Sequence, residues 1–122
     1  MRPFFGTADF DGPLYNQSMV EFAIDIPQTE LMAFCRRYHI RRLALFGSVL
    51  RDDFGPESDV DVLVDFEQNF VVRLADLLDA EEELSDLLRR SVDLGERRAV
   101  EEDPNFLRRR YILDTAQVIY ER

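Results

Sequence analysis

The fold of this chain is decided by residues 43–66, which read LALFGSVLRDDFGPESDVDVLVDF. The run from Leu43 to Phe46 is short and apolar and ends at a Gly-Ser pair, whereas Val60 to Phe66 alternates strongly. Both patterns predict strands, and the connection between them is polar and contains glycine and proline. We therefore expect two strands separated by a turn and a polar loop.

Gly47 and Ser48 follow the first of these strands directly. A Gly-Ser pair where a strand opens into a turn or helix leaves backbone N–H groups unpaired and directed outward, which suits a phosphate group. The Ser48 hydroxyl adds a further donor. Arg51 follows in the same turn, where it either neutralises phosphate charge or forms a surface pair with Asp52 or Asp53. The turn is thus a candidate phosphate site.

The second predicted strand carries Asp59 and Asp61. Residues two apart on a strand project from one face, with about 6 to 7 Å between them, so that Val60, Val62 and Val64 turn to the opposite face. One face is expected to bind and the other to pack. Two carboxylates on a rigid strand hold one or two Mg²⁺ ions, and hard oxygen ligands favour magnesium over zinc.

A third carboxylate is expected on a neighbouring strand, where it completes the metal site or accepts the proton of an attacking hydroxyl. Asp93 is the candidate, because a lone acidic residue in the short apolar run 92–94 is costly to bury without a metal or a partner. Gly-Ser pairs and Asp-x-Asp triplets are each common, but their combination between strands is far more specific. The predicted site residues are Gly47, Ser48, Arg51, Asp59, Asp61 and Asp93.

Outside this stretch, Pro27 suits the first turn of a helix. The apolar residues that follow it have the spacing of an amphipathic helix; they are Leu31, Phe34, Cys35 and Tyr38. Val72 to Arg90 has the length and composition of a second helix, and we interpret its acidic run at 81–83 as solvated surface. Ser91 to Leu94 is a brief candidate strand.

A last helix is predicted to start at Asp103 and Pro104. Its residues on one stripe are Leu107, Tyr111, Thr115 and Val118. The predicted order is helix, strand, strand, helix, strand, helix. We expect an α/β fold, in which a small mixed sheet has helices packed on one face and the carboxylates on the other.

A chain of 122 residues forms one compact domain with a modest core. Residues 1–26 show neither helical nor strand periodicity and are expected to form an irregular tail, followed by the domain at 27–122. Met19 lies just ahead of the first patterned segment and is an alternative start.

The formal net charge is −10, from 25 acidic and 15 basic residues, and such a field repels phosphate backbones. We therefore expect no direct binding of nucleic acid. The single cysteine, Cys35, cannot form an internal disulfide, which fits a reducing cytoplasm. No stretch reaches the roughly 18 apolar residues of a membrane span, and the N-terminus lacks the pattern of an export signal. The expected location is cytoplasmic.

Residues 43–66 resemble the signature of the DNA polymerase beta-like nucleotidyltransferase superfamily, in its minimal nucleotidyltransferase (MNT) branch. The family pattern is Gly-Ser, ten residues, Asp-x-Asp, followed by a third carboxylate. Matching residues in this chain are Gly47, Ser48, Asp59, Asp61 and Asp93. The resemblance covers residues 27–122 and implies the nucleotidyltransferase fold. The chain departs from the commoner family turn at Leu50 and Asp52, where a small residue and glycine are frequent.

The resemblance also implies roles for these residues. Gly47 and Ser48 would hold a triphosphate, Asp59 and Asp61 the metals, and Asp93 would activate the acceptor hydroxyl as part of the same metal-binding group. Within the branch, the chain is most similar to MNT antitoxins encoded beside HEPN-domain ribonuclease toxins. That similarity implies Mg²⁺-dependent transfer of AMP from ATP to a tyrosine of the HEPN partner, with two Mg²⁺ ions as cofactor.

Two alternatives stay open at the level of sequence. The first is an antitoxin that acts mainly by binding and masking its partner, which the acidic composition favours. The second is an enzyme that transfers a nucleotide to a small-molecule hydroxyl. The short chain argues against the second alternative, because larger members of the superfamily add a domain that encloses such an acceptor.

Overall fold

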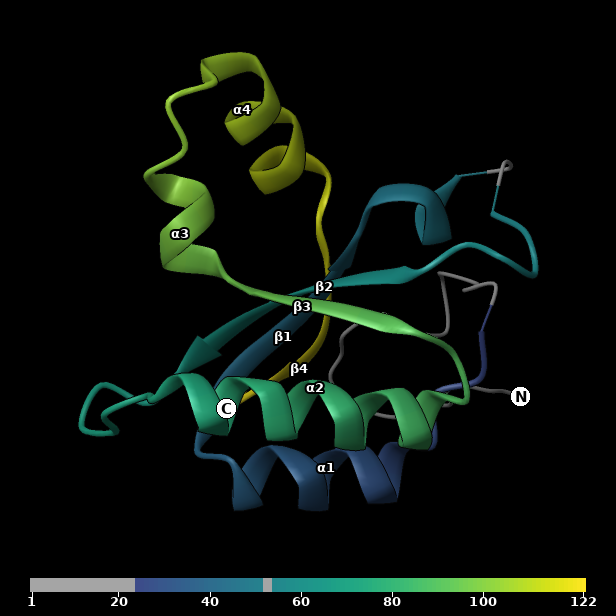
Figure 1. Cartoon of the computed structure of the whole chain (residues 1–122), viewed down its shortest axis with the longest axis vertical. Helices are drawn as coiled ribbons and strands as arrows, with labels where there is room; N and C mark the ends of the chain where they lie inside the picture. The colour runs from purple at the N-terminus through teal and green to yellow at the C-terminus, as the bar shows by residue number, and fades with distance from the viewer. Residues whose placement is uncertain (1–23, 52–53) are drawn as a thin grey trace.

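A computed structural model describes residues 24–51 and 54–122 of the chain (Figure 1). The predicted start at Met19 and most of the predicted irregular tail lie outside these residues. The elements in chain order are α1 (Gln28–Arg37), β1 (Ile40–Phe46), the 3₁₀ helix η2 (Gly47–Leu50), β2 (Val60–Phe66), α2 (Leu74–Leu88), β3 (Val92–Glu96), α3 (Arg97–Glu101), α4 (Phe106–Thr115) and β4 (Gln117–Glu121).

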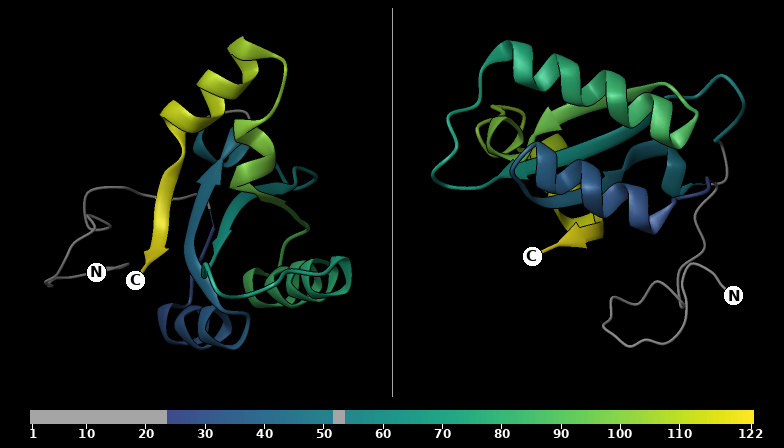
Figure 2. Two further views of the ribbon diagram at one scale, coloured as in Figure 1. Left: turned by 90° about the vertical axis from the view of Figure 1, so that its left-hand side faces the viewer. Right: turned by 90° about the horizontal axis from the view of Figure 1, so that it is seen from below.

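Within the described residues, four strands form one mixed sheet in the order β3-β2-β1-β4. β1 is antiparallel to β2 and β4, whereas β2 and β3 run parallel, so that a crossover is needed between them. α2 supplies that crossover and lies beside α1 on one face of the sheet (Figures 1 and 2). α3 and α4 lie on the other side. The predicted α/β fold with a small mixed sheet is confirmed.

The core lies between the sheet and the α1–α2 layer. Val60, Val62 and Val64 are buried there, as the alternation in β2 predicts, together with apolar residues of both helices. Cys35 belongs to this cluster, and burial raises the pKa of its thiol to about 12. The thiol therefore stays protonated at neutral pH and packs as a small apolar side chain.

The prediction for the end of the chain is wrong in part. The last helix runs from Phe106 to Thr115, and the following residues form β4, so that Val118 lies on a strand. Residues 117–121, QVIYE, are rich in β-formers, and Ile119 and Tyr120 become buried when the segment pairs with β1. This pairing is a long-range effect that helical spacing does not reveal. The short helix α3 also goes unpredicted.

Two details of α2 and α4 also differ from expectation. The acidic run of α2 is more than solvated surface, because Glu81 accepts a hydrogen bond from the backbone of β3 and Glu83 accepts one from the Tyr38 hydroxyl. None of the residues of α4 is buried, and Leu107 on its predicted apolar stripe is 75% exposed. α4 therefore owes little of its placement to the core. None of the described helices has the length and apolar character needed to cross a membrane.

Candidate functional site

At Gly47, the end of β1 lies directly against the carboxylate of Asp61. Phe46, the last residue of β1, is paired with Asp61 of β2, and Gly47 then adopts a φ of 78°, in the left-handed region. A methyl group added at Gly47 would overlap Oδ2 of Asp61 and would lie 3.3 Å from its Cγ. Glycine is required here both for the backbone conformation and for the close approach of the turn to the carboxylate.

The sheet places two of the predicted carboxylates side by side. Asp61 and Asp93 are direct partners in the parallel register of β2 and β3, and the preceding pair, Val60 and Val92, is buried against the helices. Alternation along the strands therefore turns both aspartates to the opposite face, away from α1 and α2, with the strands about 4.8 Å apart. Asp59 lies one residue before β2 and not within it, and it is exposed.

The charges of Asp93, Asp59 and Arg51 act on the carboxylate of Asp61. Burial raises the pKa of Asp61 above its ordinary value, and the nearby charges of Asp93 and Asp59 raise the pKa further, whereas Arg51 lowers it. Like charges held this close disfavour ionisation of Asp61, and a cation between them would offset the repulsion. Among residues 24–51 and 54–122, however, no three acidic, histidine or cysteine side chains stand as a ready-made metal-binding group.

The backbone on either side of Asp93 is hydrogen-bonded to side chains of α2. β3 is an edge strand of the sheet, and the residues on either side of Asp93 donate their backbone N–H groups to α2. The N–H of Val92 donates to Ser85 Oγ at 3.1 Å, and that of Leu94 donates to Glu81 Oε2 at 2.8 Å. The donors of this edge are thus satisfied, and the backbone that carries Asp93 is held at two points.

Arg90, which sequence reasoning missed, anchors the loop that leads into Asp59. Its Nη2 donates to the carbonyl oxygens of Gly55 at 2.6 Å and Ser58 at 2.9 Å, and its guanidinium lies 4.3 Å from the centre of the Phe54 ring. The sequence offers no signal for this role, because an arginine at the end of a helix resembles any solvated residue. Asp65, which the sequence places on the strand but away from the turn, pairs with Arg42 at 2.9 Å.

Replacing Arg90 with methionine is expected to loosen this loop. The variant keeps an apolar stem but loses two charge-assisted hydrogen bonds and the contact with Phe54, so the free energy of unfolding should fall by about 1 to 3 kcal/mol. Chemical denaturation measures the change. Arg89→Met is the matched control, because Arg89 is the exposed neighbour of Arg90 and its replacement removes the same charge. Equal stability of the two variants would contradict the anchoring role of Arg90.

The sequence of this chain matches a known protein family over most of its length. The model of the family described as "Nucleotidyltransferase domain" matches residues 31–119. This chain belongs to that family. The match spans the turn, all three carboxylates and the whole of β1, β2 and β3, and it ends within β4, so the nucleotidyltransferase fold and the site described above belong to the same part of the chain.

Individual curated relatives match this nucleotidyltransferase domain over a shorter stretch than the family model does. Protein adenylyltransferase MntA of Thermococcus cleftensis is 41% identical over 58 residues, which are 48% of this chain and 57% of that protein. The matched region spans only about three fifths of the length of the curated relatives, 57% to 64%.

Two solved structures share the fold. A candidate minimal nucleotidyltransferase has 27% identity and a TM-score of 0.56, with 80% of this chain and 97% of that chain covered. The MNT antitoxin complex with a tri-AMPylated Shewanella oneidensis HEPN toxin has 15% identity and a TM-score of 0.52, with 78% and 70% covered.

Proposed function

We propose that this nucleotidyltransferase domain is an antitoxin-type protein adenylyltransferase, which transfers AMP from ATP to a tyrosine hydroxyl of a HEPN-domain ribonuclease toxin. The observation that carries the proposal is that Asp61 and Asp93 are strand partners on one face and that the Gly47 turn closely approaches Asp61. The acceptor class is supported by the relatives, since MntA is named a protein adenylyltransferase and an MNT antitoxin forms a complex with an AMPylated HEPN toxin.

In this proposal Gly47 and Ser48 bind the triphosphate, and Arg51 neutralises part of its charge. The absence of a side chain at Gly47 lets phosphate oxygens approach the backbone closely. The turn touches Asp61, so a triphosphate bound there has its reacting phosphate beside the carboxylates. A guanidinium suits this position because its planar donors match phosphate oxygens.

In this proposal Asp59, Asp61 and Asp93 would hold Mg²⁺, although their side chains are not already gathered as a metal-binding group in the described residues. Carboxylate oxygens are the ligands that magnesium prefers, and the repulsion that raises the pKa of Asp61 is the kind of charge that a divalent ion offsets. Bound Mg²⁺ would supply neutralisation of the charge that develops on the triphosphate oxygens during transfer. The residues were predicted from sequence, and their role as metal ligands stays a prediction.

The transfer itself needs one proton acceptor and one leaving group. The acceptor oxygen forms a bond to the α-phosphorus of ATP, the bond to the bridging oxygen breaks, and pyrophosphate leaves. Asp93 takes the proton of the attacking hydroxyl, because it is exposed on the edge strand where an incoming side chain can reach it. The hydrogen bonds made by Val92 and Leu94 hold the backbone that carries this carboxylate.

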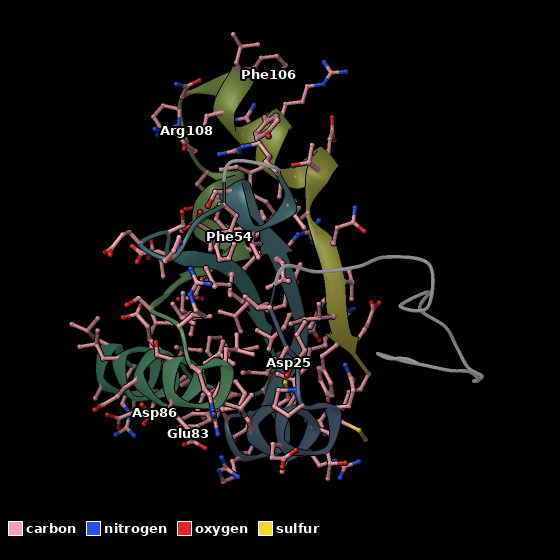
Figure 3. All side chains as sticks on the ribbon, turned by 90° about the vertical axis from the view of Figure 1, so that its right-hand side faces the viewer. Asp25, Phe54, Glu83, Asp86, Phe106 and Arg108 are labelled. Carbon is pink, nitrogen blue, oxygen red and sulfur yellow. The ribbon has the colours of Figure 1, made fainter. Side chains whose placement is uncertain are left out.

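A protein acceptor also fits the exposed apolar side chains of α4. Phe106, Leu107 and Tyr111 are 53%, 75% and 49% exposed, on a helix at the same side of the sheet as the carboxylates. Figure 3 shows Phe106 at the end of the α3–α4 pair that is farthest from α1. A protein that contacts this helix while its tyrosine enters the site would cover these side chains, which a small-molecule acceptor would leave in water.

The direct test is transfer to a co-expressed HEPN partner, followed by intact mass. The wild-type chain with ATP and Mg²⁺ should add AMP to the partner, and a chelator should prevent the addition. Asp59→Ala should lose it, whereas Asp86→Ala should not, because Asp86 is exposed on α2, on the other side of the sheet (Figure 3). Equal AMP addition by wild type and Asp59→Ala would refute the proposed chemistry.

A second candidate function is masking of the toxin surface without need for transfer. The net charge of −10 favours it, because an RNA-binding toxin surface is expected to be basic. The Asp59→Ala variant separates the two functions. If the variant still neutralises the toxin at native expression, masking suffices; if toxicity returns while the complex persists, transfer is what neutralises.

A further inference from the structure

A hydrogen bond joins the phosphate turn to α4 across a long sequence separation. Arg51 directly follows η2, and its Nη1 donates to the hydroxyl of Tyr111 at 3.3 Å, although the two residues are 60 positions apart. Both side chains are exposed to solvent. The contact therefore contributes little to the core, and its location beside the carboxylates indicates a role in the site.

The fold fixes the position of Tyr111 without burying it. Helix α4 leads within one residue into β4, and Gln117, the first residue of β4, pairs with Leu45 just before the turn at Gly47. The end of α4 is thus tied to the end of β1. Tyr111 lies about one turn from that end, and its carbonyl accepts a hydrogen bond from the Thr115 hydroxyl at 2.7 Å.

A neutral acceptor suits an arginine that must receive a phosphate. The guanidinium of Arg51 lies close enough to Asp61 for the opposite charges of the two groups to attract. A tyrosine hydroxyl orients the planar group without adding a negative charge of its own. Fixing a rotamer-rich arginine in advance also lowers the entropic cost of binding.

We propose that Tyr111 is a positioning residue, whose hydroxyl holds Arg51 toward the triphosphate tail of ATP, so that α4 forms a second wall of the nucleotide site. The inference rests on the proposed function for the identity of the ligand. It assigns α4 to nucleotide binding in addition to acceptor contact. Arg51 touches the β- and γ-phosphates in this arrangement, and the α-phosphate stays beside the carboxylates.

The test is nucleotide binding by the full chain, measured by titration calorimetry with Mg²⁺. Tyr111→Phe should weaken ATP binding by about threefold to tenfold, the range of one hydrogen bond, and should leave AMP binding unchanged. The transfer rate at saturating ATP should stay within about twofold, since Arg51 contacts the tail and not the reacting phosphate. The matched control is Tyr38→Phe, which removes a hydroxyl bonded to Glu83 in the α1–α2 layer.

A double-mutant cycle separates positioning from general structure. In an Arg51→Met background, Tyr111→Phe should have no further effect on ATP binding, because its partner is gone. The proposal is overturned if wild type does not bind ATP, or if Tyr111→Phe binds ATP as tightly as wild type does. It is equally overturned if Tyr111→Phe weakens the binding of AMP as much as that of ATP, or if Tyr111→Phe still weakens ATP binding in the Arg51→Met background. It is also overturned if peptide mass mapping finds AMP on Tyr111, since the hydroxyl would then be an acceptor. A wild type that binds ATP but transfers nothing refutes the proposed function alone.

Discussion

Asp61→Asn is expected to abolish AMP transfer and, at the same time, to raise the thermal stability of the chain. Loss of this carboxylate removes the proposed metal ligand at the centre of the site, so the transfer rate should fall roughly a thousandfold or more. Stability should rise because burial and the charges of Asp93 and Asp59 raise the pKa of Asp61 in the folded state. Ionised Asp61 therefore destabilises the folded state, and the neutral amide of an asparagine at this position does not.

The sign of the pH dependence follows from the raised pKa. The ionised carboxylate destabilises the folded state at neutral pH, and protonation relieves this cost as the pH falls through the folded pKa. The asparagine variant is relieved at every pH, so its advantage in melting temperature over wild type should shrink on acidification. Both measurements are made without divalent ions, because a bound cation would stabilise wild type alone.

Asp65→Asn is the matched control for Asp61→Asn, because it makes the same chemical change on the same strand. Asp65 is paired with Arg42 at 2.9 Å, away from the turn, so its replacement should leave transfer intact and should lower stability slightly. A melting temperature of Asp61→Asn below that of wild type would contradict the account, because Asp61 would then have a stabilising role. Retained transfer by Asp61→Asn would contradict the catalytic role.

Gly47→Ala is expected to have the second largest effect. Alanine at a φ of 78° costs about 1 to 2 kcal/mol, and its methyl group would overlap the carboxylate of Asp61. Either the turn or the carboxylate must move. A displacement of about 1 Å at a reacting centre costs on the order of a hundredfold in rate, so transfer should fall by at least that factor. Steady-state transfer and thermal denaturation measure the two effects.

Gly55→Ala provides the comparison for Gly47→Ala. Gly55 lies in the loop between η2 and β2, and a methyl group there would meet no atom within 4 Å. This variant should fold and transfer AMP like wild type. Similar losses in the two alanine variants would mean that the effect at Gly47 is a general consequence of losing a glycine, and the specific apposition of turn and carboxylate would be wrong.

Residues 43–66 were sufficient to predict the turn and the two central strands, because their signals are local. Gly47 marks the strand end, and alternation in β2 assigns its valines to one face and its aspartates to the other. The position of Asp93 beside Asp61 is a matter of register between strands, which local spacing does not encode. The lone acidic residue in the apolar run 92–94 and the family pattern both pointed to Asp93, and the strand register places it beside Asp61.

The remaining features depend on contacts between distant segments. β4 forms because residues 117–121 pair with β1 and bury Ile119 and Tyr120, whereas their spacing also fits a continued helix. Arg90 and Tyr111 gain their contacts with the site only when α2 and α4 are packed in place. Neither residue has a sequence neighbour that would identify such a contact. The roles of Arg90 and Tyr111 can therefore be recognised only from the folded structure.

The most direct test of the central claim is a crystal structure with Mn²⁺ and a non-hydrolysable ATP analogue, with the metal located by its anomalous signal. We expect the metal signal between the carboxylates of Asp61 and Asp93, and the triphosphate against the backbone of Gly47 and Ser48. A nucleotide bound elsewhere on the chain, or a metal that contacts neither of these carboxylates, would contradict the account.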